Sequence, residues 1–285
     1  MDAAAARTIN VALGNDENTA VMEMHFPAPE IEFTDDTVFA LGGADFDATF
    51  DGRAVGNWQT NFAPKGSLLK FSQKNSGNRA CLAVSGGFTV EPWLGSRSTN
   101  LAAGVGGPAG RALAAGDVLK CAPSSDLNKI AIGRSLIPRY SRFPTLRVVP
   151  GGEFDLLTAL SERIFLNEMF TLTADSNRMG FRLRGEPLHI LHAKELVSAA
   201  VTFGTIQLLP DDQMVILMAD HQTSGGYPRI ANIVSADLPI AGQLGPNDRV
   251  GFKLITVREA EVARRGFERD LAFFKTGRQL QKPAR

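Results

Sequence analysis

The sequence lacks a long hydrophobic run, a signal segment and an excess of charge of either sign. No apolar stretch approaches the roughly 18 residues of a membrane-spanning helix, and the N-terminus has neither the basic start nor the hydrophobic core of a secretory signal. We therefore expect a cytoplasmic protein. The 30 basic and 30 acidic residues give a formal net charge of zero, so neither nucleic acid nor a membrane surface is an expected partner.

Cysteine is also scarce, with two residues in 285, which excludes a scaffold held by disulfides. Cys81 and Cys121 each lie in or beside an apolar, strand-like segment, so we interpret both as buried free thiols without a catalytic role. His189 and His192 have a spacing that resembles a metal site, but no further ligands accompany them. This favours structural histidines, and we expect no metal there.

Several catalytic motifs are missing. The sequence has no GxxxxGK[ST] loop, no GxGxxG at a strand-to-helix turn, no HExxH and no paired CxxC. The segment GSRS at 95–98 places serines beside an arginine but does not form the GxSxG of a nucleophile elbow. No Met-Lys-Met tripeptide is present, so this chain carries no covalent biotin.

What the sequence does contain is a series of short apolar segments bounded by Gly, Pro, Asp or Asn. This pattern is typical of barrels and sandwiches and predicts a mainly β protein. With 44% hydrophobic residues, the chain can bury the core of one large or two modest domains. The expected strands are 38–41, 67–71, 80–86, 117–122, 146–150, 169–173, 204–210, 214–219 and 249–255.

Two helices are predicted. The segment 152–165 places Phe154, Leu157, Leu160, Ile164 and Phe165 near one face, and the segment 257–280 carries Phe267, Leu271 and Phe274 on one side. The second is a terminal helix, docked on its own chain or on a partner. Pro144 and Pro150 mark a connection, so we place boundaries at 1–145, 146–258 and 259–285.

The stretch DHQTSGGYP, residues 220–228, lies between two apolar runs and holds six polar side chains around two glycines. A plain turn needs far fewer hydrogen-bonding groups. Two interpretations stay open, a long solvated hairpin loop or a loop that faces a ligand at the mouth of a barrel.

A larger set of motifs carries a family resemblance. The chain contains LAVSGGF, LGSRST, SNRMGFRLRG, GTIQLLPDDQMVILMADHQTSGGYP and IVSADLPIAGQLGPNDRVGF, preceded by AVMEMHFPAPEIEF and ALGGADF. In this order they closely resemble the allophanate hydrolase subunit 2 family, whose stand-alone members include the C subunit of 5-oxoprolinase. The resemblance covers about residues 1–258.

The resemblance implies a cyclophilin-like barrel with a second, smaller β subdomain. It also implies work beside two other proteins, a B-like subunit of related fold and an A-like hydrolase subunit. Together they would form an ATP-dependent complex that opens the lactam of 5-oxoproline to glutamate, with this chain inactive alone. Two alternatives come with the family. One is a carboxyltransferase that moves CO2 from carboxybiotin to a urea-like amide, and the other is a regulatory partner, since a further member is described as an antagonist of a histidine-kinase inhibitor.

The chain also departs from the family pattern. The opening MDAAAARTINVALGN resembles the middle of a family motif, so we expect the N-terminal β subdomain to lack the family's first strand. Asn177 stands where the family more often has Asp, Phe181 where it has Tyr, and His221 where it often has Arg. The lost carboxylate argues against a general base at Asn177.

The implied chemistry needs cations for phosphate and hydrogen-bond donors for the lactam. Arg178 and Asp220, with His221, are the candidate catalytic residues, in which Asp220 or His221 handles a proton or Asp220 holds a metal ion. Arginine suits phosphate because its planar fork binds two oxygens, although each arginine could instead form a surface ion pair. The candidate binding residues are Gly86, Gly87, Ser96, Arg97, Ser98, Gln222, Thr223, Gly225, Gly226, Tyr227 and Arg229.

Overall fold

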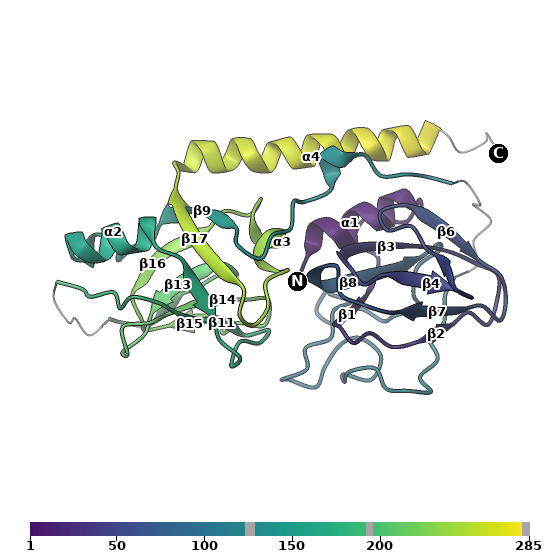
Figure 1. Ribbon diagram of the computed structural model, residues 1–285, viewed down its shortest axis with the longest axis horizontal. Coiled ribbons are helices and arrows are strands. Elements are labelled where there is room, and N and C mark those ends of the chain that lie inside the picture. Colours follow the sequence, from purple (N-terminus) through teal and green to yellow (C-terminus); the bar gives the residue numbers. More distant parts are fainter. Residues whose placement is uncertain (123–128, 192–195, 281–285) are drawn as a thin grey trace. The chain divides into compact units, whose positions relative to one another are not determined.

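The computed structural model describes residues 1–122, 129–191 and 196–280 (Figure 1). The chain forms two compact units. One contains Met1 and Arg139–Gly266, and the other contains Asp2–Pro138 and the chain from Phe267 onward. The chain passes from one unit to the other after residues 1, 138 and 266. The domain boundaries expected from the sequence stay predictions, because compactness alone does not define an independently folding domain.

The unit that contains residues 139–266 is built on a closed barrel of seven strands in the order β10-β11-β14-β13-β16-β9-β17. Neighbouring strands are antiparallel, except that β9 and β17 are parallel. The mainly β fold expected from the sequence is confirmed. The strands are β9 (Thr145–Pro150), β10 (Phe170–Leu172), β11 (Gly180–Arg184), β13 (Thr205–Leu208), β14 (Met214–Leu217), β16 (Arg229–Ile233) and β17 (Arg249–Leu254).

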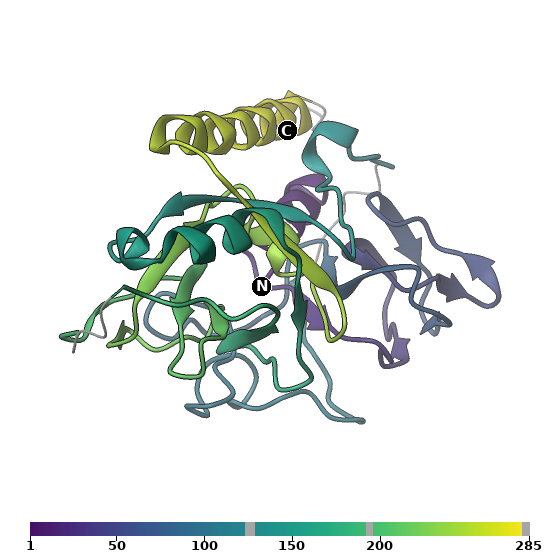
Figure 2. The ribbon, with the colours of Figure 1, turned by 60° about the vertical axis from the view of Figure 1, so that its left-hand side comes forward.

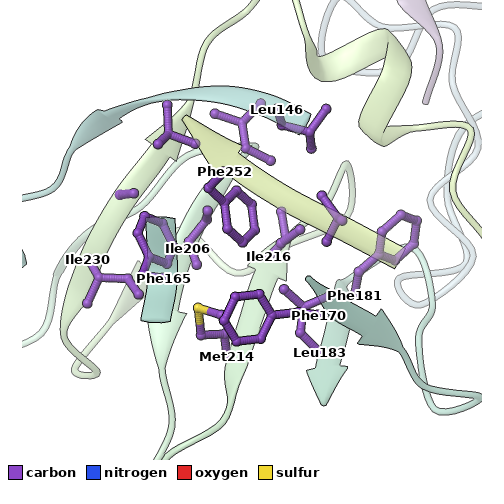
Figure 3. Packing of buried hydrophobic residues seen from close by; sticks show 14 of the residues in the cluster. Leu146, Phe165, Phe170, Phe181, Leu183, Ile206, Met214, Ile216, Ile230 and Phe252 are labelled. Atoms are coloured by element: carbon purple, nitrogen blue, oxygen red, sulfur yellow. The ribbon is translucent and has the colours of Figure 1, made fainter. Parts of the chain in front are cut away.

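The barrel closes around a continuous apolar core, because alternate residues of each strand point inward. Phe165 stacks on Phe252 with ring centroids 4.8 Å apart, and Phe170 lies 6.1 Å from the same ring. Figure 3 shows these rings with Ile206 and Met214 inside the barrel. Aromatic rings of this size fill the interior with side chains, so the barrel is a packed core and not a channel.

Helices are few in this unit. The helix predicted over 152–165 is only partly correct: a 3₁₀ turn, η2 (Phe154–Leu156), comes first, and α2 runs from Ala159 to Asn167. Thr158 begins α2, since its hydroxyl accepts a hydrogen bond from the Ser161 N–H. This shifts the buried face, and Leu160 is 62% exposed. The remaining short elements are α3 (Leu238–Ala241), β12 (Ala199–Ala200) and β15 (Ser224–Gly225).

The other unit contains two four-stranded sheets, ordered β1-β8-β3-β6 and β2-β7-β4-β5. A phenylalanine cluster fills its core, with Phe33, Phe39 and Phe50 in mutual ring contact. The strands are β1 (Met22–Met24), β2 (Ile31–Glu32), β3 (Thr37–Asp45), β4 (Ala48–Phe50), β5 (Arg53–Ala54), β6 (Thr60–Ala63), β7 (Leu68–Phe71) and β8 (Ser76–Val84); a 3₁₀ turn, η1, spans Arg134–Leu136.

Two expectations for this unit are wrong, the strand at 117–122 and the burial of Cys121. The strand expected at 117–122 is only a single bridge between Cys121 and Phe88, so Cys121 is exposed and not buried, while Cys81 is buried in β8. Burial raises the pKa of the Cys81 thiol, which makes it inert. The helix α1 (Ala3–Ala12) was missed. It begins at Asp2, whose carboxylate accepts from the Ala5 N–H, and it packs its alanine-rich face on an apolar cluster.

The predicted terminal helix is confirmed as α4 (Val257–Leu280), a continuous helix in both ribbon views (Figure 1, Figure 2). Thr256 and Glu259 form a reciprocal capping box at its start. Its later turns pack Phe267, Leu271 and Phe274 against the cluster that includes α1. No helix within the described ranges is long and apolar enough to span a membrane.

Candidate functional site

An arginine–carboxylate pair forms at one end of the barrel. Arg178 lies just before β11 and Asp220 lies just after β14, and the ladder between these strands continues into both residues, since the Asp220 N–H donates to the Arg178 carbonyl at 2.9 Å. The guanidinium then donates from Nε to Oδ2 at 2.8 Å and from Nη2 to Oδ1 at 3.1 Å. The structure therefore brings together two predicted catalytic residues that are 42 positions apart.

This pair is more enclosed than the sequence suggested. The Asp220 side chain is 12% exposed and the Arg178 side chain 26% exposed. The two guanidinium bonds occupy two of the roughly four lone-pair positions of the carboxylate, so Asp220 can still accept from a ligand. His221 follows directly, and its Nδ1 contacts the Gln222 carbonyl oxygen. The arrangement can hold a fixed negative oxygen toward the N–H of an amide.

A second pair of the same kind involves Arg229 at the start of β16. It donates from Nε and Nη2 to Glu153 at 2.9 and 2.7 Å, and its backbone N–H donates to the same carboxylate at 2.9 Å. Another guanidinium nitrogen reaches the Ala200 carbonyl at 3.5 Å. Hydrogen bonding to Arg229 holds the pKa of Glu153 below its usual range, and Glu153 in turn raises the pKa of Arg229.

The register of the strands places these two pairs at opposite ends of the barrel. Strand β13 lies between β14 and β16 and is antiparallel to both, so β14 and β16 run in the same direction. Asp220 follows the end of β14, whereas Arg229 begins β16. The sequence predicted one site that includes Arg178, Asp220 and Arg229. The structure brings the first two together and separates them from the third.

The stretch 220–228 connects these two ends by crossing the outer face of β13. Ile206 and Leu208 point into the core, so Gln207 points outward, and it is nevertheless 1% exposed. Its amide donates to the Tyr227 carbonyl at 3.3 Å, and a Cβ on Gly225 would lie 2.7 Å from the same amide nitrogen. The stretch therefore extends beyond the mouth of the barrel, and Gly225 is required for its close packing on the strand. Whether it faces a ligand stays a prediction.

Other polar side chains of this stretch stay accessible. Gln222 and Thr223 are exposed, Tyr227 is 46% exposed, and Gly226 is exposed beside them. The backbone is fixed by the pairing of β15 with β12 and by the bond from the Val201 N–H to the Thr223 carbonyl. The stretch thus presents its hydrogen-bonding side chains from an anchored backbone.

The remaining candidate residues belong to the other unit. Gly86 and Gly87 both have φ of +81°, and an added Cβ on either would lie 2.3 Å from a neighbouring atom. Their N–H groups donate to the Asn15 side chain and to the Val84 carbonyl. Glycine is therefore required here by the fold, and both donors are used within the chain.

The serines and arginine of the segment 95–98 lie on the surface. Trp93 and Ser96 pair across a tight turn, and the Ser98 N–H donates to the Ser96 hydroxyl at 3.1 Å. Ser96, Arg97 and Ser98 are all exposed, and Arg97 has no ion pair within the described part of the chain. Of the three arginines proposed for phosphate, Arg97 is the one not already bound to a carboxylate.

No group of three or more potential metal-ligating side chains occurs among residues 1–122, 129–191 and 196–280. His189 pairs with Asp212 at 3.2 Å, while His192 lies outside the described residues. Sequence reasoning missed two partners of the candidate residues, Glu153 and Asn15. Each directly follows a glycine in a turn, but nothing local indicates that Glu153 binds an arginine 76 positions away.

Comparison with known proteins agrees with this architecture. The C subunit of 5-oxoprolinase from Haemophilus influenzae is 34% identical over 265 residues, which cover 93% of this chain and 84% of that protein. The protein of the same name from Escherichia coli is 35% identical over 269 residues, with coverages of 94% and 86%. The names of these relatives describe subunits of a larger enzyme.

A solved structure shows the same fold. Urea carboxylase of Kluyveromyces lactis superposes with a TM-score of 0.90 at 26% identity, covering 98% of this chain and 26% of that one. The chain thus corresponds to about a quarter of that protein. The model of the carboxyltransferase domain, subdomain A and B, matches residues 1–254. The resemblance read from the sequence motifs is confirmed, and the chain belongs to this carboxyltransferase domain family.

Proposed function

We propose that this chain is the C subunit of an ATP-dependent 5-oxoprolinase that opens the lactam of 5-oxoproline to glutamate. The observation that supports this most strongly is coverage in both directions. The two relatives that carry the name of this subunit match over more than nine-tenths of this chain and over 84% and 86% of their own length. The similarity therefore extends over most of two proteins that are each named as a subunit of 5-oxoprolinase.

In this proposal Asp220 accepts a hydrogen bond from the lactam N–H, and Arg178 fixes the carboxylate in orientation. ATP would supply the activation by transferring its γ-phosphoryl group to the amide oxygen, with release of ADP. Water then adds to the carbonyl carbon and the ring nitrogen leaves as a protonated amine, which gives an acyl phosphate. A second water releases phosphate from this acyl phosphate and gives glutamate. Of the three arginines expected to bind phosphate, Arg178 and Arg229 are already bound to Asp220 and Glu153. We therefore propose that the B-like and A-like subunits contribute to nucleotide binding and that the chain is inactive alone.

The test is reconstitution. The chain is mixed with B-like and A-like subunits from the same organism, and formation of glutamate from 5-oxoproline and ATP is measured, with each subunit omitted in turn. Glutamate in the complete mixture alone is the expected result. A complete complex that hydrolyses no 5-oxoproline would contradict the proposal.

A second function is supported by the similarity to urea carboxylase at a TM-score of 0.90. In that case the chain acts as a carboxyltransferase subunit that moves CO2 from carboxybiotin on another chain to a urea-like amide. Supplying the same mixtures with a carboxylated biotin carrier and urea distinguishes the two. Carboxylation of urea without any glutamate would favour this second function.

A further inference from the structure

The outer face of the barrel carries an excess of positive charge on three adjacent strands. On β11 and β17, Phe181, Leu183, Val250 and Phe252 point into the core, so the alternate residues point outward. The outward cations Arg182, Arg184, Arg249 and Lys253 are all exposed, and these strands hold no outward acidic residue.

Register aligns part of this charge in one row. Thr171 on β10 pairs with Arg184 on β11 and also with Arg249 on β17. The two arginines therefore flank one threonine hydroxyl, with their Cα atoms about 10 Å apart, twice the usual spacing between strands.

The row continues onto an exposed aromatic ring. The Arg249 N–H donates to the Arg142 carbonyl and the Gly251 N–H to the Pro144 carbonyl, which places Phe143 beside Arg249. Pro144 is buried, so Phe143 points outward, and it is 58% exposed. We call Phe143, Thr171, Arg182, Arg184 and Arg249 the arginine row.

The charge of the arginine row is not neutralised within the chain as described. Elsewhere on the barrel, Arg147 is bound to Asp237 and Arg229 to Glu153. Arg182, Arg184 and Arg249 have no ion pair among the described residues. The acidic residues close to them in sequence form none with them, and Asp248, directly before Arg249, is bound to Arg142; the others are Glu168, Asp175 and Glu186. Because the whole chain has no net charge, this is a local concentration of positive charge.

We propose that the arginine row is an interface for an acidic surface of another protein subunit, and this inference rests on the proposed function, which supplies the subunits. Exposed arginines around one aromatic side chain have the composition of an interface hot spot. Side chains that point outward from adjacent strands can contact a folded partner, and complementary charge accelerates association and sets orientation. Phe143 supplies the apolar anchor and the arginines select carboxylates.

The experiment measures binding of the chain to B-like and A-like subunits from the same organism, at low and high salt. The variant R182E/R184E/R249E is expected to weaken binding to one of them by about 100-fold at low salt. The variant F143S is expected to weaken binding by roughly 10-fold and to keep the salt dependence of the wild-type chain. The matched control R53E/K120E/R264E reverses the same number of charges at exposed cations outside the arginine row and is expected to bind normally.

Circular dichroism and thermal unfolding confirm that each variant folds, and R182Q/R184Q/R249Q replaces the reversal if it does not fold. Normal binding by the row variants overturns the inference, as does the absence of any complex with either subunit. Loss of self-association or of oligonucleotide binding in the row variants, with subunit binding intact, overturns it in favour of a second copy or of nucleic acid. A complex that depends on the row but forms no glutamate would contradict the proposed function and leave the interface standing.

Discussion

Each end of the barrel carries an arginine–carboxylate pair, and the two pairs have different surroundings. Arg178 with Asp220 and Arg229 with Glu153 are both bidentate pairs, and the carboxylates are 12% and 13% exposed. Arg229 also reaches the Ala200 carbonyl, and its backbone N–H and carbonyl both form hydrogen bonds to Glu153. Similar pairs can therefore serve a site at one end and connect chain segments at the other, and geometry alone does not distinguish them.

Neutralising each carboxylate in turn tests whether the two pairs have different roles, and we expect it to give the largest effect. We expect Asp220→Asn to lower 5-oxoprolinase turnover of the complete complex by about 100-fold or more, the usual effect of losing a group that handles a proton or orients the substrate. Glu153→Gln is the matched control at the other end and should keep turnover within about 3-fold, well short of that range. Equal losses in both variants would show that both pairs act structurally.

The glycines beside the two pairs should respond differently to an added methyl group. A Cβ on Gly151 would lie 1.9 Å from the Arg229 carbonyl oxygen, whereas a Cβ on Gly180 would meet the Val215 side chain at 2.8 Å. We expect Gly151→Ala to lower the free energy of unfolding by about 3 kcal/mol and Gly180→Ala by about 1 kcal/mol, because a side chain can move and the backbone cannot. Urea denaturation measures both, and a larger effect at Gly180 would contradict the steric argument.

The pair at the Arg229 end should also contribute more stability than a pair on a helix surface. We expect a double-mutant cycle on Arg229 and Glu153 to give a coupling energy of about 1 to 2 kcal/mol. The control is Arg265 with Glu261 on α4, whose side chains are 75% and 53% exposed. That pair should give about 0.3 kcal/mol. A coupling at Glu153 no larger than the control would show that solvent screens both pairs alike.

The smallest effect concerns pH. Because Arg229 lowers the pKa of Glu153, the stability from this pair is present above the unfolded-state pKa of about 4.3 and is lost as pH falls through the lower folded-state pKa. The difference in unfolding free energy between the wild type and Glu153→Gln should therefore shrink from pH 6 to pH 3. Urea titrations across this range measure it, and a constant difference would contradict a native-state ion pair.

Much of the barrel could be predicted from the sequence because its strands have strong local patterns. The segments 146–150, 204–210 and 249–255 are apolar and end at turn residues, and each matches a strand of the structure to within a few residues. The segment 117–122 has a similar pattern but forms no strand, since a strand exists only where a partner strand pairs with it. The helix α1 was not predicted, because short alanine-rich segments carry little hydrophobic periodicity.

The residues of the candidate site could be predicted from the sequence, but which of them contact one another could not. Arg178, Asp220 and Arg229 were all selected by residue type beside glycine loops, and all three lie at ends of barrel strands. Whether any two of them meet depends on strand order and register. Both are long-range properties, and the insertion of β13 between β14 and β16 is invisible in the local sequence.

The sequence by itself determined the β-rich composition, the family and the terminal helix α4, because alternation, motif order and helical periodicity are local patterns that need no partner to be read. Only the tertiary structure decided that Arg229 binds Glu153, that residues 220–228 cross the outer face of β13, and that three arginines lie together on one outer face. These follow from the closure of the barrel, since hydrogen bonding between distant strands fixes which side chains become neighbours.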